Sequence, residues 1–156
     1  MKRTFKIWRV DSKGGEFSTY SIKLEEGMVV LDAIHRIQAE QSPELAVRWN
    51  CKAGKCGSCS MEINGRPKLA CMTRMNEFNP NETITIEPVK TFPIIKDLVT
   101  DVSGNYKQNK MIAPFAPKEK INTDDHIMYQ QDVERIQEFR KCIECYLCQD
   151  VCHVLR

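Results

Sequence analysis

Four cysteines in the first half of the chain have a spacing that suits metal binding. Cys51 and Cys56 are separated by four residues, Cys56 and Cys59 by two, and Cys71 follows after eleven more. This is the plant-type pattern C-x4-C-x2-C…C, in which four thiolates hold a [2Fe–2S] cluster. We therefore predict that these four side chains, the first cysteine group, bind such a cluster and that the chain passes single electrons.

The residues between these cysteines fit the same interpretation. Gly54 and Gly57 stand between the ligands, where glycine permits the positive φ angles that a tightly curled loop needs. Such a loop turns its N–H groups inward, and these donors stabilise the negative charge of a cluster and its thiolates. Ser58 can add a hydroxyl donor. We expect Gly54, Gly57 and Ser58 to contribute to binding the cofactor.

A second cysteine group lies near the end of the sequence. Cys142, Cys145, Cys148 and Cys152 have the spacing C-x2-C-x2-C-x3-C, which is the bacterial [4Fe–4S] run. In that run the first three cysteines bind one cluster and the fourth binds another, and His153 stands where proline normally follows. Either all four close on one cluster, or a downstream cysteine group is missing. The usual use of this run favours the second possibility.

Zinc binding and free thiols remain as alternatives for both groups. Structural zinc usually takes paired C-x2-C knuckles, and in the first cysteine group only Cys56 and Cys59 form one. In the second cysteine group a C-x2-C-x2-C zinc site or a labile thiol patch stays open. His153 could bind a metal, but a lone histidine beside a cluster more often packs or donates a hydrogen bond. No catalytic residue is expected.

Composition excludes several other classes of function. The net charge is only +2, from 23 basic and 21 acidic residues, and the absence of a long Lys/Arg block argues against nucleic-acid binding. Mean hydropathy is −0.44, and no apolar run approaches the roughly 20 residues of a membrane span. With no visible export signal, we expect a cytoplasmic chain without stable disulfides, which reaches a membrane only through partners.

The elements that must position the first cysteine group read as a small α+β domain. Alternating apolar residues predict strands at 5–10, 20–24 and 84–87. Apolar residues at helical spacing predict a helix over 28–40. Asn64-Gly65 is a hairpin signal that predicts a return strand to about Leu69. Together these elements predict a β-grasp plant-type [2Fe–2S] ferredoxin domain over residues 1–92.

The rest of the sequence predicts more helix. Apolar spacing predicts helices over 91–102 and 132–141, with a polar connecting stretch over 103–130. We therefore expect a helix and connecting segment over 93–130, and the incomplete start of an α-helical bacterial-ferredoxin-like domain over 131–156. The predicted fold class is α+β.

The residues around both cysteine groups resemble the iron–sulfur subunit of succinate dehydrogenase and fumarate reductase. The resemblance rests on five stretches: CKAGKCGSCS from Cys51, NGRP from Asn64, CMT from Cys71, KTFPIIKDLVTD from Lys90 and FRKCIECYLC from Phe139. It covers nearly the whole chain, and two cluster motifs in this order are far more specific than either motif alone.

The resemblance implies an electron relay. A flavoprotein partner would oxidise succinate to fumarate at FAD, or run the reverse, and electrons would cross [2Fe–2S], [4Fe–4S] and [3Fe–4S] clusters to a quinone at a membrane anchor subunit. It implies that Cys142, Cys145 and Cys148 are three ligands of the [4Fe–4S] cluster and that Cys152 is one ligand of the [3Fe–4S] cluster. The subunit would lie peripherally on the inner face of the cell membrane.

The sequence also departs from this family. Members continue past the first cysteine run with further cysteines that complete the last two clusters, so we expect a truncated chain. A serine and a tryptophan of the quinone pocket usually follow the run, where residues 153–156 read HVLR. A free ferredoxin-like carrier, or an electron-input domain of another flavoenzyme, is the alternative function, since the first 90 residues alone would fit it. A zinc-stabilised interaction module is the alternative outside redox chemistry.

Overall fold

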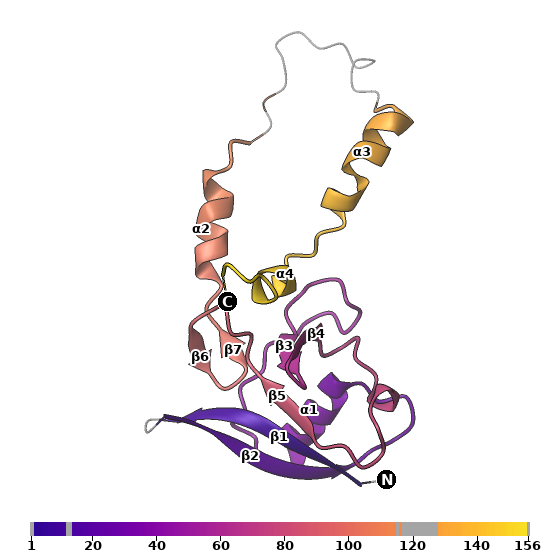
Figure 1. Cartoon of the computed structure of the whole chain (residues 1–156), viewed down its shortest axis with the longest axis vertical. Coiled ribbons are helices and arrows are strands. Elements are labelled where there is room, and N and C mark those ends of the chain that lie inside the picture. The colour runs from indigo at the N-terminus through magenta and orange to yellow at the C-terminus, as the bar shows by residue number, and fades with distance from the viewer. Residues whose placement is uncertain (1, 12–13, 115, 117–127, 156) are drawn as a thin grey trace. The chain divides into compact units, whose positions relative to one another are not determined.

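The structure is a computed structural model that describes residues 2–11, 14–114, 116 and 128–155. The chain divides into two compact units, which we treat separately (Figure 1). The first unit combines Met1–Asp101 with Glu144–Arg156, and the second is Val102–Ile143. The first cysteine group therefore shares a unit with the last part of the sequence. The domain limits predicted at residues 92 and 130 remain a prediction.

A five-stranded mixed sheet forms the centre of the first unit. Its strand order is β2-β1-β5-β3-β4, and β1 and β2 make a long curved antiparallel ribbon (Figure 1). β1 also pairs in parallel with β5. On its other side β5 pairs antiparallel with β3, which forms a hairpin with β4. The strands are β1 (Lys2–Asp11), β2 (Gly14–Lys23), β3 (Ser60–Ile63), β4 (Arg66–Leu69) and β5 (Ile84–Glu87).

One helix, α1 (Val30–Glu40), supplies much of the core of this unit. Its apolar residues Leu31, Ile34 and Ile37 are at most 1% exposed and belong to one cluster with Phe5 and Ile84 of the sheet. Burying each such side chain contributes about 2 kcal/mol. The predicted α+β class, with α1 packed on a mixed sheet, is confirmed for this unit. The helix begins two residues later than predicted.

The helix predicted over 91–102 is wrong. This segment instead contains a two-stranded antiparallel sheet of β6 (Ile94–Lys96) and β7 (Val99–Thr100). Between the strands, Asp97 has a φ of 47° and is completely buried. Its carboxylate accepts hydrogen bonds from the N–H groups of Val10, at 2.9 Å, and Ala46, at 2.8 Å. These distant partners outweigh the helical spacing of the apolar residues.

In its described residues the second unit contains two helices. The helix predicted over 132–141 is confirmed as α3 (Gln130–Arg140). The stretch predicted to be irregular over 103–130 contains a helix at its start, α2 (Ser103–Met111), so that part of the prediction is wrong, and residues 117–127 lie outside the described residues. Neither helix buries a side chain, and Phe139 is 80% exposed. No helix within the described ranges is both long and apolar enough to cross a membrane.

Candidate metal centre

The β3–β4 hairpin brings the ends of the first cysteine group together. Cys59 directly precedes β3, and Cys71 lies just beyond the end of β4. The paired strands align Ser60 with Leu69, and the Ala70 N–H donates to the Cys59 carbonyl at 3.0 Å. Because a hairpin returns the chain to its starting edge, two cysteines separated by eleven residues become neighbours. The predicted Asn64–Gly65 turn is present, with positive φ at both residues.

The loop between α1 and β3 carries the other two cysteines. Gly54 and Gly57 have φ angles of 64° and 68°, as the sequence predicted. The N–H groups of Ala53 and Lys55 both donate to the Cys51 sulfur at 3.3 Å. The loop thus turns backbone donors toward a thiol, which is the arrangement that stabilises thiolate charge.

The four thiols fall into an outer and an inner pair. Cys51 and Cys56 are half-buried, whereas Cys59 and Cys71 are buried. A hydrogen bond from the Ser58 hydroxyl, followed by hydrogen bonds from Cys51, lowers the pKa of Cys56 from 9.0 to about 6. Burial raises the pKa of Cys59 from 9.0 to about 11. Cys56 therefore favours the thiolate already, while Cys59 needs a metal to make its buried negative charge tolerable.

This donor set fits a two-iron cluster. Each iron of a [2Fe–2S] cluster takes two cysteine thiolates from the protein, and hydrogen bonding links Cys51 with Cys56 and Cys59 with Cys71. Within the part of the chain that the structure describes, no three His, Cys, Asp or Glu side chains converge to hold a single metal ion. The two linked pairs match the two thiolates that each iron of such a cluster would need.

The structure treats the second cysteine group differently. Cys142 lies in the second unit and is exposed, whereas Cys145, Cys148 and Cys152 lie in the first unit. Cys148 lies within the short helix α4 (Leu147–Asp150), and Cys145 and Cys152 lie on either side of it in the sequence. This helix contacts β4 (Figure 1). The predicted metal ligands of this group are therefore divided between the units, and their use as ligands remains a prediction.

Sequence reasoning missed two residues, Ser60 and Asp150, that connect residues 144–155 (the last segment) to β3 and to the loops that flank the first cysteine group (the first-cluster region). The Ser60 hydroxyl lies 2.8 Å from the carbonyl oxygen of Cys145. Asp150 is completely buried and accepts a hydrogen bond from the Lys90 N–H at 2.7 Å. The only sequence signal was an acidic residue inside a cysteine run, and its partner could not be inferred because it lies 60 residues away.

An aromatic cluster beside Cys51 was also missed. Trp49 is 47% exposed, and its ring lies 4.7 Å from the ring of His35 and 5.0 Å from the Lys52 ammonium. Lys52 also lies 3.8 Å from an Asp32 carboxylate oxygen. Burial, and then the charge of Lys52, hold the pKa of His35 below its usual value of 6.5.

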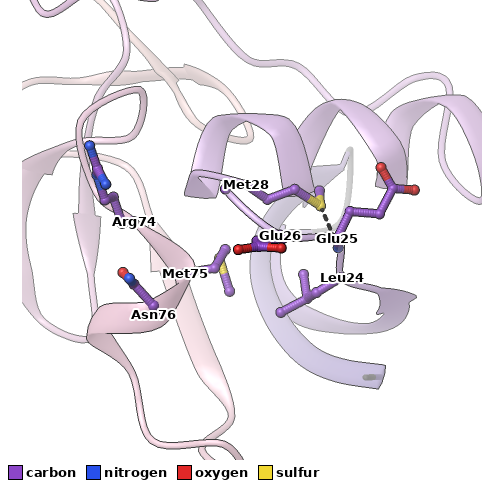
Figure 2. Close-up of a pocket in the computed structure, with 8 residues that line it drawn as sticks. Leu24, Glu25, Glu26, Met28, Arg74, Met75 and Asn76 are labelled. Carbon is purple, nitrogen blue, oxygen red and sulfur yellow. Dashed lines mark hydrogen bonds between the residues drawn. The ribbon is translucent and has the colours of Figure 1, made fainter.

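A cavity of about 440 Å³ lies beside the start of α1 and has no cysteine in its lining (Figure 2). Its walls combine the apolar side chains of Leu24, Met28 and Met75 with the charged side chains of Glu25 and Arg74. The Glu25 N–H donates to the Met28 sulfur at 3.2 Å, which holds this side of the wall in place. The cavity is therefore separate from the two cysteine pairs.

Comparisons with known proteins agree with the motifs. The chain is 57% identical to a chain of the Mycobacterium smegmatis Sdh1 complex in the apo form, with a TM-score of 0.93, and the match covers 99% of this chain and 65% of that one. It is 33% identical to the fumarate reductase iron-sulfur subunit of Mycobacterium tuberculosis over 141 residues, covering 88% of this chain and 57% of the relative.

A similar relative is the succinate dehydrogenase iron-sulfur subunit of Paracoccus denitrificans, which is 33% identical over 157 residues, covering 96% of this chain and 59% of the relative. The chain thus spans a little under three fifths of the two curated relatives. These matches confirm the predicted resemblance to succinate dehydrogenase and fumarate reductase iron–sulfur subunits. The sequence model of the 2Fe-2S iron-sulfur cluster binding domain matches residues 4–107, and the chain belongs to that family.

Proposed function

We propose that this chain is the electron-transfer part of a succinate dehydrogenase or fumarate reductase, relaying electrons between FAD in a partner flavoprotein and a membrane quinone. The observation that carries this proposal is the similarity to a chain of an Sdh1 complex, which extends over 99% of the sequence at 57% identity. The match to the 2Fe-2S cluster binding domain alone would fit a free ferredoxin-like carrier equally well. The similarity to the chain of the Sdh1 complex, however, continues through the second cysteine group.

The first cysteine group is the proposed site of a [2Fe–2S] cluster. When bound, such a cluster takes up one electron and returns it. Cys51 and Cys56 would hold the outer iron, and Cys59 and Cys71 the inner iron. The N–H groups of Ala53 and Lys55 would stabilise the negative charge that reduction adds.

The second cysteine group is the proposed start of a second domain over 131–156. Cys142, Cys145 and Cys148 would supply three ligands of a [4Fe–4S] cluster, and Cys152 one ligand of a [3Fe–4S] cluster. The remaining ligands would come from residues outside this sequence, since the two curated relatives are longer than the part that matches this chain. The chain would reach the inner face of the cell membrane through anchor subunits.

The test is electron delivery from succinate. The chain is coexpressed with a flavoprotein partner and purified anaerobically, and succinate is added while the EPR signal of the reduced [2Fe–2S] cluster is recorded. We expect the signal to appear with succinate and to be absent when the flavoprotein is omitted. A chain that forms no complex, and whose cluster is reduced by dithionite but never by succinate, would instead be a free carrier.

A further inference from the structure

The start of β3 touches the second cysteine group directly. The Ser60 hydroxyl lies 2.8 Å from the carbonyl oxygen of Cys145 and 2.8 Å from that of Gly57. A serine hydroxyl has one proton, so it donates to one of these oxygens at a time and holds both close. Ser60 directly follows the ligand Cys59 in the sequence. The first-cluster loop and the Cys145 backbone therefore meet at a single side chain.

Gly57 allows this contact to be close. A Cβ atom added at Gly57 would lie 2.6 Å from the Cys145 Cα and 2.8 Å from its nitrogen. Both neighbouring atoms belong to the backbone, which cannot swing aside as a flexible side chain does. Glycine at this position therefore serves two purposes, since it adopts a φ of 68° and leaves room for Cys145.

The other end of the segment is also fixed to the first-cluster region. The buried carboxylate of Asp150 accepts hydrogen bonds from the N–H groups of Lys90, at 2.7 Å, and Thr91, at 3.1 Å. The Lys90 ammonium in turn lies 2.7 Å from a carboxylate oxygen of Glu62, a buried residue of β3. The stretch from Cys145 to Asp150 is thus linked to β3 at both ends.

The backbone around Cys145 is bent in an unusual way. Glu144 and Tyr146, on either side of it, have positive φ angles of 54° and 59°, which costs free energy for residues other than glycine. The ring of Tyr146 meets the ring of Phe92 edge-on at 5.9 Å. The contacts of Cys145 with Gly57 and Ser60 compensate for this strained turn.

We propose that Gly57 and Ser60 are positioning residues that seat Cys145 against the first-cluster loop, with Asp150 fixing the far end of the same segment. This inference rests on the proposed function. In that relay, the contact of Cys145 with Gly57 and Ser60 is the place where an electron leaves the first cluster for the second site.

Hydrogen–deuterium exchange of the whole chain tests the seat, by which we mean the contact of Cys145 with Gly57 and Ser60. The protein is purified anaerobically with its [2Fe–2S] cluster, and exchange is followed in peptides covering residues 144–155. In Gly57→Ala we expect exchange there to rise about tenfold, as overpacking forces the segment away. Gly65→Ala is the matched control, since its φ is 70° but nothing lies within 4 Å of the added Cβ.

A second control separates strain in the loop from loss of the seat. Gly54 has a φ of 64°, and its added Cβ would meet only the flexible side chain of Met72. Gly54→Ala should therefore leave exchange over 144–155 unchanged. An equal rise in Gly54→Ala, Gly65→Ala and Gly57→Ala would overturn the proposal, and so would wild-type exchange in Gly57→Ala.

Ser60 provides an independent test that does not strain the loop. Removing its hydrogen bond in Ser60→Ala should raise exchange over 144–155 about fivefold, while Ser60→Thr, which keeps the hydroxyl, should restore it. Thr19→Ala, on the exposed part of β2, is the control for loss of a hydroxyl. If Ser60→Thr exchanges as fast as Ser60→Ala, or if Ser60→Ala exchanges like the wild type, the positioning role is wrong.

The EPR signal of the dithionite-reduced [2Fe–2S] cluster is recorded for every variant and should persist in Ser60→Ala and Ser60→Thr. If Gly57→Ala fails to retain the cluster, the comparison of Ser60→Ala with Ser60→Thr tests the positioning role by itself. A chain that succinate and flavoprotein cannot reduce would contradict the proposed function yet leave the exchange result intact. The two failures are therefore distinguishable.

Discussion

The two cysteine groups are positioned in opposite ways. The first cysteine group is held by its own neighbours in the sequence, through the Gly-containing loop and the β3–β4 hairpin. Cys145 is held by residues far away, with Ser60 lying 85 residues earlier in the chain. A site built locally can take shape by itself, whereas a site built from distant contacts depends on another region already being folded. Mutations should therefore affect the two regions unequally.

The largest expected effect is the loss of a cluster ligand. Cys51→Ser should abolish or severely weaken the EPR signal of the reduced [2Fe–2S] cluster, because it removes one of the four thiolates that would hold the two irons. Cys145→Ser should leave that signal intact. Loss of the signal in both variants would show that the two groups do not act as separate sites.

The next effect concerns the buried aspartate that holds the first unit together. Asp97→Ala should lower the free energy of unfolding by about 3 kcal/mol, measured by urea denaturation. It leaves the half-buried N–H groups of Val10 and Ala46 without their acceptor and removes a partner of Arg9. Glu44→Ala is the control, since Glu44 pairs with the same Arg9 but is exposed. Similar destabilisation by both variants would contradict the role of the buried contacts.

A smaller and more local effect is expected at the buried aspartate of the last segment. Asp150→Asn should reduce the local opening free energy of residues 144–155 by about 1 kcal/mol, because it removes the charge that strengthens the hydrogen bonds from Lys90 and Thr91. Hydrogen exchange measures this change, and the urea midpoint should stay close to that of the wild type. A large shift of the midpoint would mean that the segment is essential to the fold of the whole unit.

The smallest effect concerns the rim of the first cysteine group. Lys52→Met should raise the pKa of His35 toward its usual value without reaching it, because burial is the larger cause of the lowering and Lys52 the second. The pKa is measured by NMR titration, and an unchanged value would show that Lys52 does not contribute to the lowering.

The same histidine makes stability depend on pH in a defined direction. The folded state binds its proton less readily than the unfolded state, so stability should decrease as the pH falls below about 6.5. His35→Gln should remove that part of the dependence.

Sequence reasoning succeeded where the cause of a structure lay nearby. The Asn64–Gly65 signal and the glycines of the cysteine loop determine local backbone angles, so the hairpin and the curled loop were predictable. The segment 91–102 was misread because Asp97 finds its partners 87 and 51 residues away. The seat of Cys145 was invisible for the same reason, since a serine and a glycine within a ligand loop gave no indication of a partner near the end of the sequence.

The distance in sequence between Ser60 and Cys145 also has a consequence for the order in which the protein matures. During synthesis the sheet can close once β5, which ends at Glu87, has left the ribosome, and domains generally fold from the N-terminus onward. The scaffold for the first cysteine group is then complete, while Cys145 has still to be translated. The nascent chain is therefore ready to receive iron at its first site earlier than at its second, and the newly made segment arrives on a surface that is already formed.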